Sequence, residues 1–126
     1  MPALEPVRGI RVVADPEALD AARWTGDDVT VLRFAPDEAL ALGATAVDID
    51  DDHAIVEDEA GFMAGPVDLA DVAAHIEWSL PTERPALAQG SIAGVPAKLW
   101  LTDEGATLIV QVAYVADLAD RLGWPR

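Results

Sequence analysis

The acidic segment 46–62 contains the side chains whose types and spacing are best suited to chemistry. Its carboxylates follow the pattern of a calcium-binding loop, with the first, third, fifth and twelfth positions occupied by Asp48, Asp50, Asp52 and Glu59. Hard divalent cations need several oxygen ligands on a loop that folds back on itself, so this spacing is chemically reasonable. The sixth position, where such a loop needs a glycine for its sharp turn, is His53. The segment is therefore either a cation loop or a solvated turn, and the absent glycine favours the turn.

A second group of reactive side chains centres on His75, which follows Asp71 by four residues and precedes Ser79 by four. A serine nucleophile needs a base, a strained turn that presents its hydroxyl group, and an oxyanion hole. The residues around Ser79 show no nucleophile-elbow pattern. An Asp–His pair at helical spacing is ordinary helix electrostatics, and we therefore predict no catalytic residue.

Cofactor and metal motifs are not evident elsewhere in the sequence. Gly90 and Gly94 have no lysine–serine continuation and no following helix, so they do not form a phosphate loop. The chain has no cysteine, which excludes disulfides, thiol catalysis and zinc–thiolate sites. We predict no bound cofactor, no resident metal and no enzymatic activity of the chain's own.

Composition excludes further classes of function. The 126 residues are 52% hydrophobic, enough for one folded domain spanning 1–126. The net charge is −15, from 23 acidic against 8 basic residues, which argues against binding to nucleic acid or to an anionic membrane. Such acidity fits high solubility, a salt-adapted cell or a basic partner surface. The chain begins without a signal-peptide pattern and has no membrane-length apolar run, so a cytoplasmic location is expected.

The elements that position these residues follow from periodicity, caps and turns. Strands are predicted at 9–14, 28–35, 46–49, 53–58, 87–92, 97–101 and 107–114. Helices are predicted at 16–24, 36–43, 66–78 and 115–122. The two strands that flank the acidic turn are interpreted as the arms of a hairpin.

This order of elements predicts an α+β fold with two layers, in which helices pack on short antiparallel or mixed sheets. A strand followed by a helix recurs at 28–42, 53–78 and 107–122. The recurrence indicates two similar halves, 8–45 and 46–124, within the single domain.

The tryptophans suggest a surface for contact with a partner. Trp24, Trp78 and Trp124 fall at predicted helix ends, where aromatic side chains often close a small core. Trp100 alternates with Lys98 along a strand whose other face holds Ala97, Leu99 and Leu101, and that other face should pack under the final helix. A strand with hydrophobic side chains on both faces is covered on both sides or meets a partner. The candidate interface residues are Trp100, Lys98 and Trp78.

Several segments in order resemble the gamma subunit of heterotetrameric sarcosine oxidase. The resemblance lies in Val-Leu-Arg-Phe-Ala-Pro-Asp-Glu-Ala-Leu at 31–40, Ile-Val-Glu-Asp-Glu-Ala-Gly-Phe at 55–62, the strand residues 87–90 and 97–101, and the closing helix at 114–124. It implies a fold like the aminomethyltransferase domain of the glycine cleavage system. In that family the flavin, NAD and folate sites belong to the large subunits, and the gamma chain has a structural role.

The leading expectation is therefore a non-catalytic small subunit or interaction domain, with a structural role in a flavin-dependent oxidase complex. Its expected partners are the large oxidase subunits or a second copy of the chain. The alternative is a stand-alone protein that binds a small molecule or a cation. A third alternative, a small enzyme, has no candidate residues.

Overall fold

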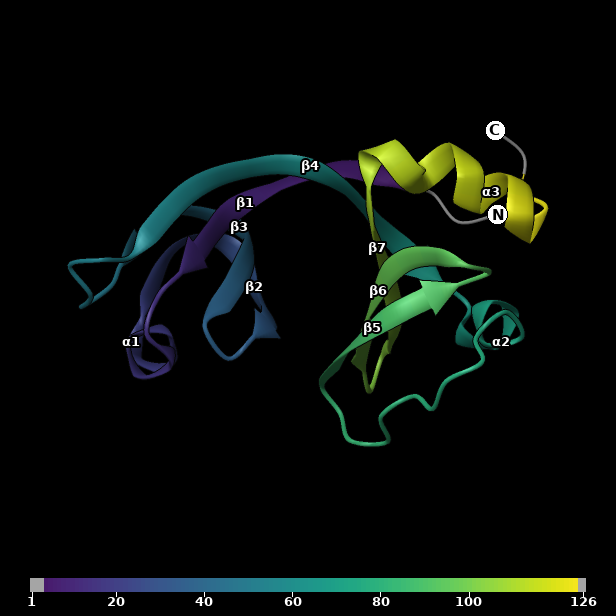
Figure 1. Ribbon diagram of the computed structural model, residues 1–126, viewed down its shortest axis with the longest axis horizontal. Helices are drawn as coiled ribbons and strands as arrows, with labels where there is room; N and C mark the ends of the chain where they lie inside the picture. Colours follow the sequence, from purple (N-terminus) through teal and green to yellow (C-terminus); the bar gives the residue numbers. More distant parts are fainter. Residues whose placement is uncertain (1–3, 125–126) are drawn as a thin grey trace. The chain divides into compact units, whose positions relative to one another are not determined.

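The computed structural model describes residues 4–124 of the chain (Figure 1). Most of these residues lie in strands. The strands of the described range are β1 (Glu5–Val13), β2 (Arg23–Ala35), β3 (Glu38–Asp48), β4 (Ile55–Val67), β5 (Ala86–Ile92), β6 (Val95–Thr102) and β7 (Gly105–Gln111). The helical segments are α1 (Pro16–Ala21), α2 (Leu69–Ala73), η1 (Val112–Tyr114) and α3 (Val115–Leu122). Hydrogen-bonded neighbours follow the order β2-β3-β1-β4-β7-β6-β5.

The described chain divides into two compact units. One comprises residues 7–61, and the other comprises the described residues on either side of that range. The boundary falls between Gly61 and Phe62, inside β4, so this long strand contributes to both units. The halves expected from the sequence have their boundary earlier, at the start of the acidic segment.

Strand β3 is the central strand of the 7–61 unit. It pairs antiparallel with β1 and with β2, so that Ala41 lies opposite both Ile10 and Val31. Ala39, Leu40 and Ala41 are at most 1% exposed, which shows that both faces of the strand are covered. The core on the α1 side of this sheet consists of Ile10, Val12, Ala14, Leu19, Ala39, Ala41 and Ala44.

The predicted helix at 36–43 is wrong, because these residues form the turn into β3 and its first half. Alanine and leucine favour helices, but a strand that is buried on both faces also presents a continuous apolar run. Pairing with two neighbouring strands outweighs the local preference. Gly43 does not end a helix either. Gly43 lies opposite a bulge in β2 and has a φ of 84°. A Cβ atom added there would come within 2.7 Å of the Asp27 carbonyl oxygen.

The hairpin predicted around the acidic turn is also wrong. Both expected arms are strands, since β3 ends at Asp48 and β4 begins at Ile55. They do not pair with each other, however, because β1 lies between them in the sheet. Asp50, Asp51 and Asp52 therefore lie in a connection that passes over the end of β1.

In the 7–61 unit, the side chain of Arg11 contacts residues of three other strands. It lies opposite Leu40 in β3. Its guanidinium group forms ion pairs with Glu38 and, at 3.5 Å, with Glu59 of β4. The same group stands 5.9 Å from the centre of the Phe34 ring, within the range of a cation–π contact. One arginine thereby links β1 to β3, to β4 and to the end of β2.

Helix α1 begins as the sequence predicts. The Asp15 side chain accepts a hydrogen bond from the Glu17 amide at 3.1 Å, and Pro16 occupies the first turn. The helix ends at Ala21, earlier than predicted, and the chain enters β2 at Arg23. Trp24 therefore lies in a strand, not at a helix end.

The 62–124 unit contains the second half of β4 and the antiparallel meander of β5, β6 and β7. Helices α2 and α3 contribute to one apolar core on one face of this sheet (Figure 1). The fully buried part of the core includes Val72 of α2, Leu118 of α3, and Leu99, Leu101 and Leu108 of the sheet. The three predicted strands are confirmed, except that the last ends at Gln111 and residues 112–114 form η1. The final helix and its stop at the left-handed Gly123 are also confirmed.

Helix α2 is shorter than the predicted helix 66–78. Pro66 and Val67 belong to β4, and the helix runs only from Leu69 to Ala73 after the cap Asp68. Within this helix Val72 is fully buried, and Leu69 packs against the same core cluster. Beyond the helix, the His75 carbonyl oxygen accepts a hydrogen bond at 2.9 Å from the amide of Ala93 in the β5–β6 turn. The backbone after Ala73 is therefore bonded to the β5–β6 turn and does not continue the helix.

The predicted α+β class with helices forming a second layer is wrong. The described chain is mostly antiparallel sheet, and its helices span only five to eight residues each. Of the four expected helices, 36–43 is turn and strand because a strand buried on both faces has the apolar composition of a helix, and 66–78 is helical only at 69–73. The fold like an aminomethyltransferase domain, which the family resemblance implied, is overturned by the same finding. Among residues 4–124, no helix is long and apolar enough to cross a membrane.

The close packing of Trp78 on Gly90 allows a test of the C-terminal core. A Cβ atom at Gly90 would lie 2.5 Å from the indole ring, which is held in place by its hydrogen bond from Nε1 to the Ser91 carbonyl oxygen at 2.8 Å. We expect Gly90→Ala to lower the free energy of unfolding by about 1–3 kcal/mol, measured by urea denaturation. Gly61→Ala is the control, since only the flexible end of Glu59 is nearby, at 3.1 Å. Equal effects of the two substitutions would contradict this packing.

Candidate functional site

The C-terminal sheet has two different faces, and β6 shows the difference most clearly. Along this strand the buried residues alternate with more exposed ones. Ala97, Leu99 and Leu101 belong to the core cluster that contains Leu118 of α3, so the predicted packing of this face under the final helix is confirmed. Lys98 and Trp100 are partly exposed on the opposite face, as the sequence predicts.

Strand register brings further residues onto the face that carries Lys98. Lys98 lies opposite Gln89 of β5 and Ile109 of β7, and Ile109 lies opposite Ala64 of β4. These four residues form one row across the sheet. The next row contains Leu87, Trp100, Thr107 and Pro66. The rows are adjacent because residues two apart along a strand point to the same face.

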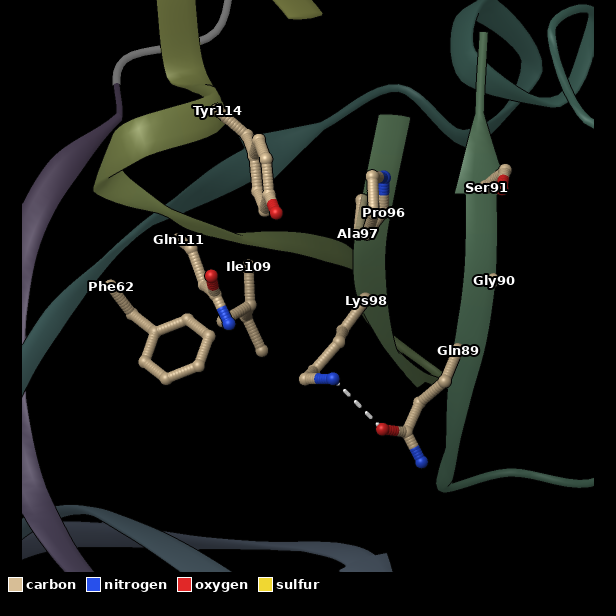
Figure 2. Close-up of a pocket in the computed structure, with 10 residues that line it drawn as sticks. All are labelled: Phe62, Gln89, Gly90, Ser91, Pro96, Ala97, Lys98, Ile109, Gln111 and Tyr114. Carbon is tan, nitrogen blue, oxygen red and sulfur yellow. Dashed lines mark hydrogen bonds between the residues drawn. The ribbon is translucent and has the colours of Figure 1, made fainter. Parts of the chain in front are cut away.

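A hollow of about 410 Å³ lies on this face at the row of Lys98. The residues that line it come from β4, β5, β6, β7 and η1: Phe62, Gln89, Gly90, Ser91, Pro96, Ala97, Lys98, Ile109, Gln111 and Tyr114. Figure 2 shows Phe62 and Gln111 on one side and Lys98 and Gln89 on the other, with Ile109 between them. The volume lies within the range of small-molecule sites, about 300–1,000 Å³.

The base of the hollow is apolar and its rim is polar. Phe62 and Ile109 are 4% and 1% exposed. Lys98 Nζ donates a hydrogen bond to Gln89 Oε1 at 2.9 Å, and Gln111 adds a second side-chain amide (Figure 2). Tyr114, which is 38% exposed, adds a phenol at the start of α3. The rim thus carries hydrogen-bonding side chains, and the apolar side chains beneath it are almost fully buried.

Lys98 is the basic side chain among the described residues that line the hollow. Lys98 is the only lysine in a protein with a net charge of −15. None of the described residues that line the hollow is acidic.

Trp78 lies apart from the other two candidate interface residues. It packs against the core cluster on the helix side of the sheet, over Gly90. Lys98 and Trp100 lie on the other side. Trp124 packs against the same cluster as Trp78, and Trp24 packs against the core of the 7–61 unit. All three tryptophans pack against a core, although Trp24 lies in β2 and Trp78 lies beyond the end of α2.

Trp100 does not line the hollow, although it is two residues from Lys98. Its neighbours in the next row are Leu87 and Thr107, and all three are partly exposed. The structure therefore brings Lys98 and Trp100 onto one face, in adjacent rows. Their role in an interface stays a prediction.

The carboxylates of the calcium-loop pattern are spread over different partners. Asp48 forms an ion pair with Arg23 at 3.2 Å, and Glu59 pairs with Arg11 while accepting a hydrogen bond from the Gly61 amide at 3.0 Å. Within residues 4–124, no group of three or more acidic or histidine side chains is placed to hold a metal ion. The geometry agrees with a structural turn.

Asp51 has the clearest structural role in the acidic segment. Its carboxylate accepts hydrogen bonds from the backbone amides of Asp15, at 2.8 Å, and His53, at 2.9 Å. The first bond attaches the acidic connection to the start of α1. Both bonds favour the charged carboxylate, the bond from Asp15 most strongly, and they lower the pKa of Asp51 below its usual value of 3.8.

The structure places the residues of the His75 group at the surface, in and after α2. Asp71, His75 and Ser79 are all exposed, with Asp71 in α2 and the other two in the segment after it. The contact that the structure gives to His75 is made by its backbone, to Ala93 in the β5–β6 turn.

No family model, curated protein or solved structure matches this chain. The family resemblance of the short segments therefore stays a prediction. The function has to be inferred from the hollow and from the face that contains it.

Of the residues that line the hollow, only Lys98 is predicted as a site residue from the sequence. Gln89, Ile109 and Gln111 lie in predicted strands. Once the register of those strands is known, the alternation of side chains places all three on the same face as Lys98. Phe62 comes from a strand whose predicted end was four residues earlier. The sequence contains no signal for the pairing of that strand with β7.

The contacts of Asp51 predict a pH-dependent stability. Because its pKa is lowered in the folded state, the carboxylate stabilises the fold at neutral pH, and this contribution is lost as the pH falls below 3.8. We expect Asp51→Asn to lower the melting temperature at pH 7, and the difference from wild type to narrow toward pH 2–3. Asp52→Asn removes the same charge from the same connection and is the control. A constant difference at all pH values would contradict the prediction.

Proposed function

We propose that the chain is a non-catalytic interaction domain that binds a protein partner through the face of its C-terminal sheet that carries Trp100. The observation that supports this proposal is the row of Leu87, Trp100 and Thr107, which lies on the side of the sheet opposite α2 and α3. Tryptophan is among the residues that most often supply binding energy at protein interfaces.

The net charge of the chain limits which partner surfaces it can bind. With a net charge of −15, the chain repels acidic surfaces and nucleic acid at long range. A partner with a basic or neutral contact surface fits better. Association with such a partner should be faster at low ionic strength, because surface charges steer the encounter.

The identity of the partner rests on the family resemblance alone. That resemblance favours the large subunits of a flavin-dependent oxidase, although the fold that it implied is not the fold of this chain. Self-association of the chain is the other expectation. The alternative function, small-molecule binding by a stand-alone protein, is favoured by the hollow beside Lys98.

The proposal predicts a selective loss of binding when the indole of Trp100 is removed. Trp100→Ala should weaken the complex by about 2 kcal/mol or more, a loss of roughly thirtyfold in affinity. The measurement is calorimetric titration with the products of neighbouring genes, together with sedimentation of the chain alone. Both are performed well below the melting temperature of the variant.

A core substitution separates lost contact from lost stability. Leu99→Ala, at a position that is 0% exposed on the helix side, should cost about 2–5 kcal/mol of unfolding free energy while the folded fraction still binds. A complex that forms with unchanged affinity after Trp100→Ala would overturn the proposal for this face.

A further inference from the structure

We propose that the outer edge of β5 pairs with the same edge of a second copy of the chain, so that two C-terminal sheets join into one. The pairing is antiparallel about a twofold axis and uses backbone hydrogen bonds around Leu87. This contact is made by the backbone at the sheet edge, whereas the proposed partner contact is made by the side chain of Trp100 on the sheet face. The two can therefore be tested separately.

Strand β5 has the features of an edge that accepts another strand. It is the last strand in the order of the sheet, and among residues 4–124 no strand pairs with its outer side (Figure 1). Its residues pair with β6 in one continuous register, without a bulge. Its sequence, Ala-Leu-Ala-Gln-Gly-Ser-Ile, has no charged residue and no proline. Bulges, charges and prolines are the means by which proteins usually prevent pairing at an edge.

The opposite edge of the sheet is protected by those means. Its strand β2 carries charged side chains at Arg23, Asp27, Asp28 and Arg33. The register of β2 with β3 is interrupted by shifts, and Asp28 has a φ of 49°. An added strand cannot follow so irregular an edge. Pairing between copies is therefore limited to β5, and a dimer formed there is closed and does not grow into a filament.

The turn between β5 and β6 determines which backbone groups point outward. Its two residues, Ala93 and Gly94, have φ values of 50° and 80° and connect the paired Ile92 and Val95. The pair that flanks such a two-residue turn exchanges both backbone hydrogen bonds. Along the strands, pairs of this kind alternate with pairs that exchange none. Counted back from Ile92, the N–H and C=O groups of Leu87 point away from β6.

The contacts of Trp78 agree with this alternation and limit the length of the open edge. The same count directs the carbonyl oxygen of Ser91 outward, and this oxygen accepts the hydrogen bond from Trp78 Nε1 at 2.8 Å. The indole also packs on Gly90. A second strand therefore pairs with the half of β5 before Gly90, where Leu87 is partly exposed. So short a contact predicts a weak dimer.

The absence of charge from β5 favours a second copy over a charged partner strand. A charged strand gains affinity from opposite charges on the edge, and β5 offers none, although 25% of the chain is charged. A second β5 is equally neutral, so no like charges lie opposite each other across the new pair. The net charge of −15 on each copy opposes their approach at long range, and salt screens this repulsion. The dimer should therefore be stronger at high salt.

The first experiment is sedimentation of the wild-type chain from about 10 µM to about 2 mM, in about 0.15 M and about 1 M NaCl. At the lower salt concentration we expect a reversible monomer–dimer equilibrium with a dissociation constant of about 0.1–1 mM, as for a small interface. At the higher salt concentration the dimer should be tighter. A chain that stays monomeric at the highest protein concentration in both salts would overturn the proposal, and so would a dimer that dissociates when salt is added.

Amide hydrogen exchange then locates the contact. The amide of Leu87 should exchange about two- to fivefold more slowly at about 1 mM protein than at about 10 µM, because it is bonded to the second copy in the dimer. The amide of Ala88, which belongs to a bonded pair with Leu99 of β6, should exchange at nearly the same rate at both concentrations. Exchange at Leu87 that does not depend on protein concentration would overturn the edge contact, whatever sedimentation shows.

Two substitutions at one position separate the backbone from the side chain. Leu87→Pro removes the outward N–H and no hydrogen bond to β6, so it should weaken the dimer by about tenfold or more and leave a folded monomer. Leu87→Ala loses the same side chain but keeps the amide, and its dimer should stay within about threefold of wild type. Equal losses in the two variants would show a side-chain contact and overturn the edge pairing. The exchange measurement on wild type does not depend on the folding of either variant.

Trp100→Ala distinguishes self-pairing from the proposed partner contact. Dimerisation should persist in this variant, because Trp100 lies in β6 and the pairing edge belongs to β5. Loss of the dimer in Trp100→Ala, with Leu87→Pro unaffected, would place self-association on the sheet face and overturn the edge proposal. Failure of the edge pairing in turn leaves the titration with the products of neighbouring genes independent.

Discussion

Packing of α2 and α3 onto one face of the C-terminal sheet is the constraint on which the functional face depends. Val72 and Leu118 fill the space above Leu99, Leu101 and Leu108, and all five are fully buried. Because side chains alternate along a strand, this packing determines which residues point to the other face. Lys98 and Trp100 lie there for the same reason that Leu99 lies in the core.

The second face of the sheet combines features that are uncommon in so acidic a chain. It carries the only lysine, a partly exposed tryptophan and a hollow with an apolar base. Trp100 and Lys98 belong to adjacent rows of this face and not to the same row. Trp78 lies on the helix side, where its ring packs over Gly90.

The 7–61 unit shows how polar side chains can hold a sheet together. Arg11 connects β1 with Glu38 of β3 and Glu59 of β4, and Asp51 attaches the acidic connection to the start of α1. Two of the carboxylates that suggested a cation loop, Asp48 and Glu59, therefore neutralise arginines of neighbouring strands. The acidic segment stabilises the 7–61 unit through specific hydrogen bonds and ion pairs.

The sequence by itself determined the features that depend on neighbours along the chain. The stripe of Val115, Leu118 and Leu122 with the terminal Gly123 specifies α3, and the turns at 93–94 and 103–105 specify the meander of β5, β6 and β7. Only the tertiary structure decided that 36–43 becomes strand, since a segment buried on both faces has the same apolar composition as a helix. It also decided that β1 lies between β3 and β4, and that Phe62 joins Lys98 at one hollow. Those arrangements depend on pairing between strands that are distant along the chain, for which local sequence contains no signal.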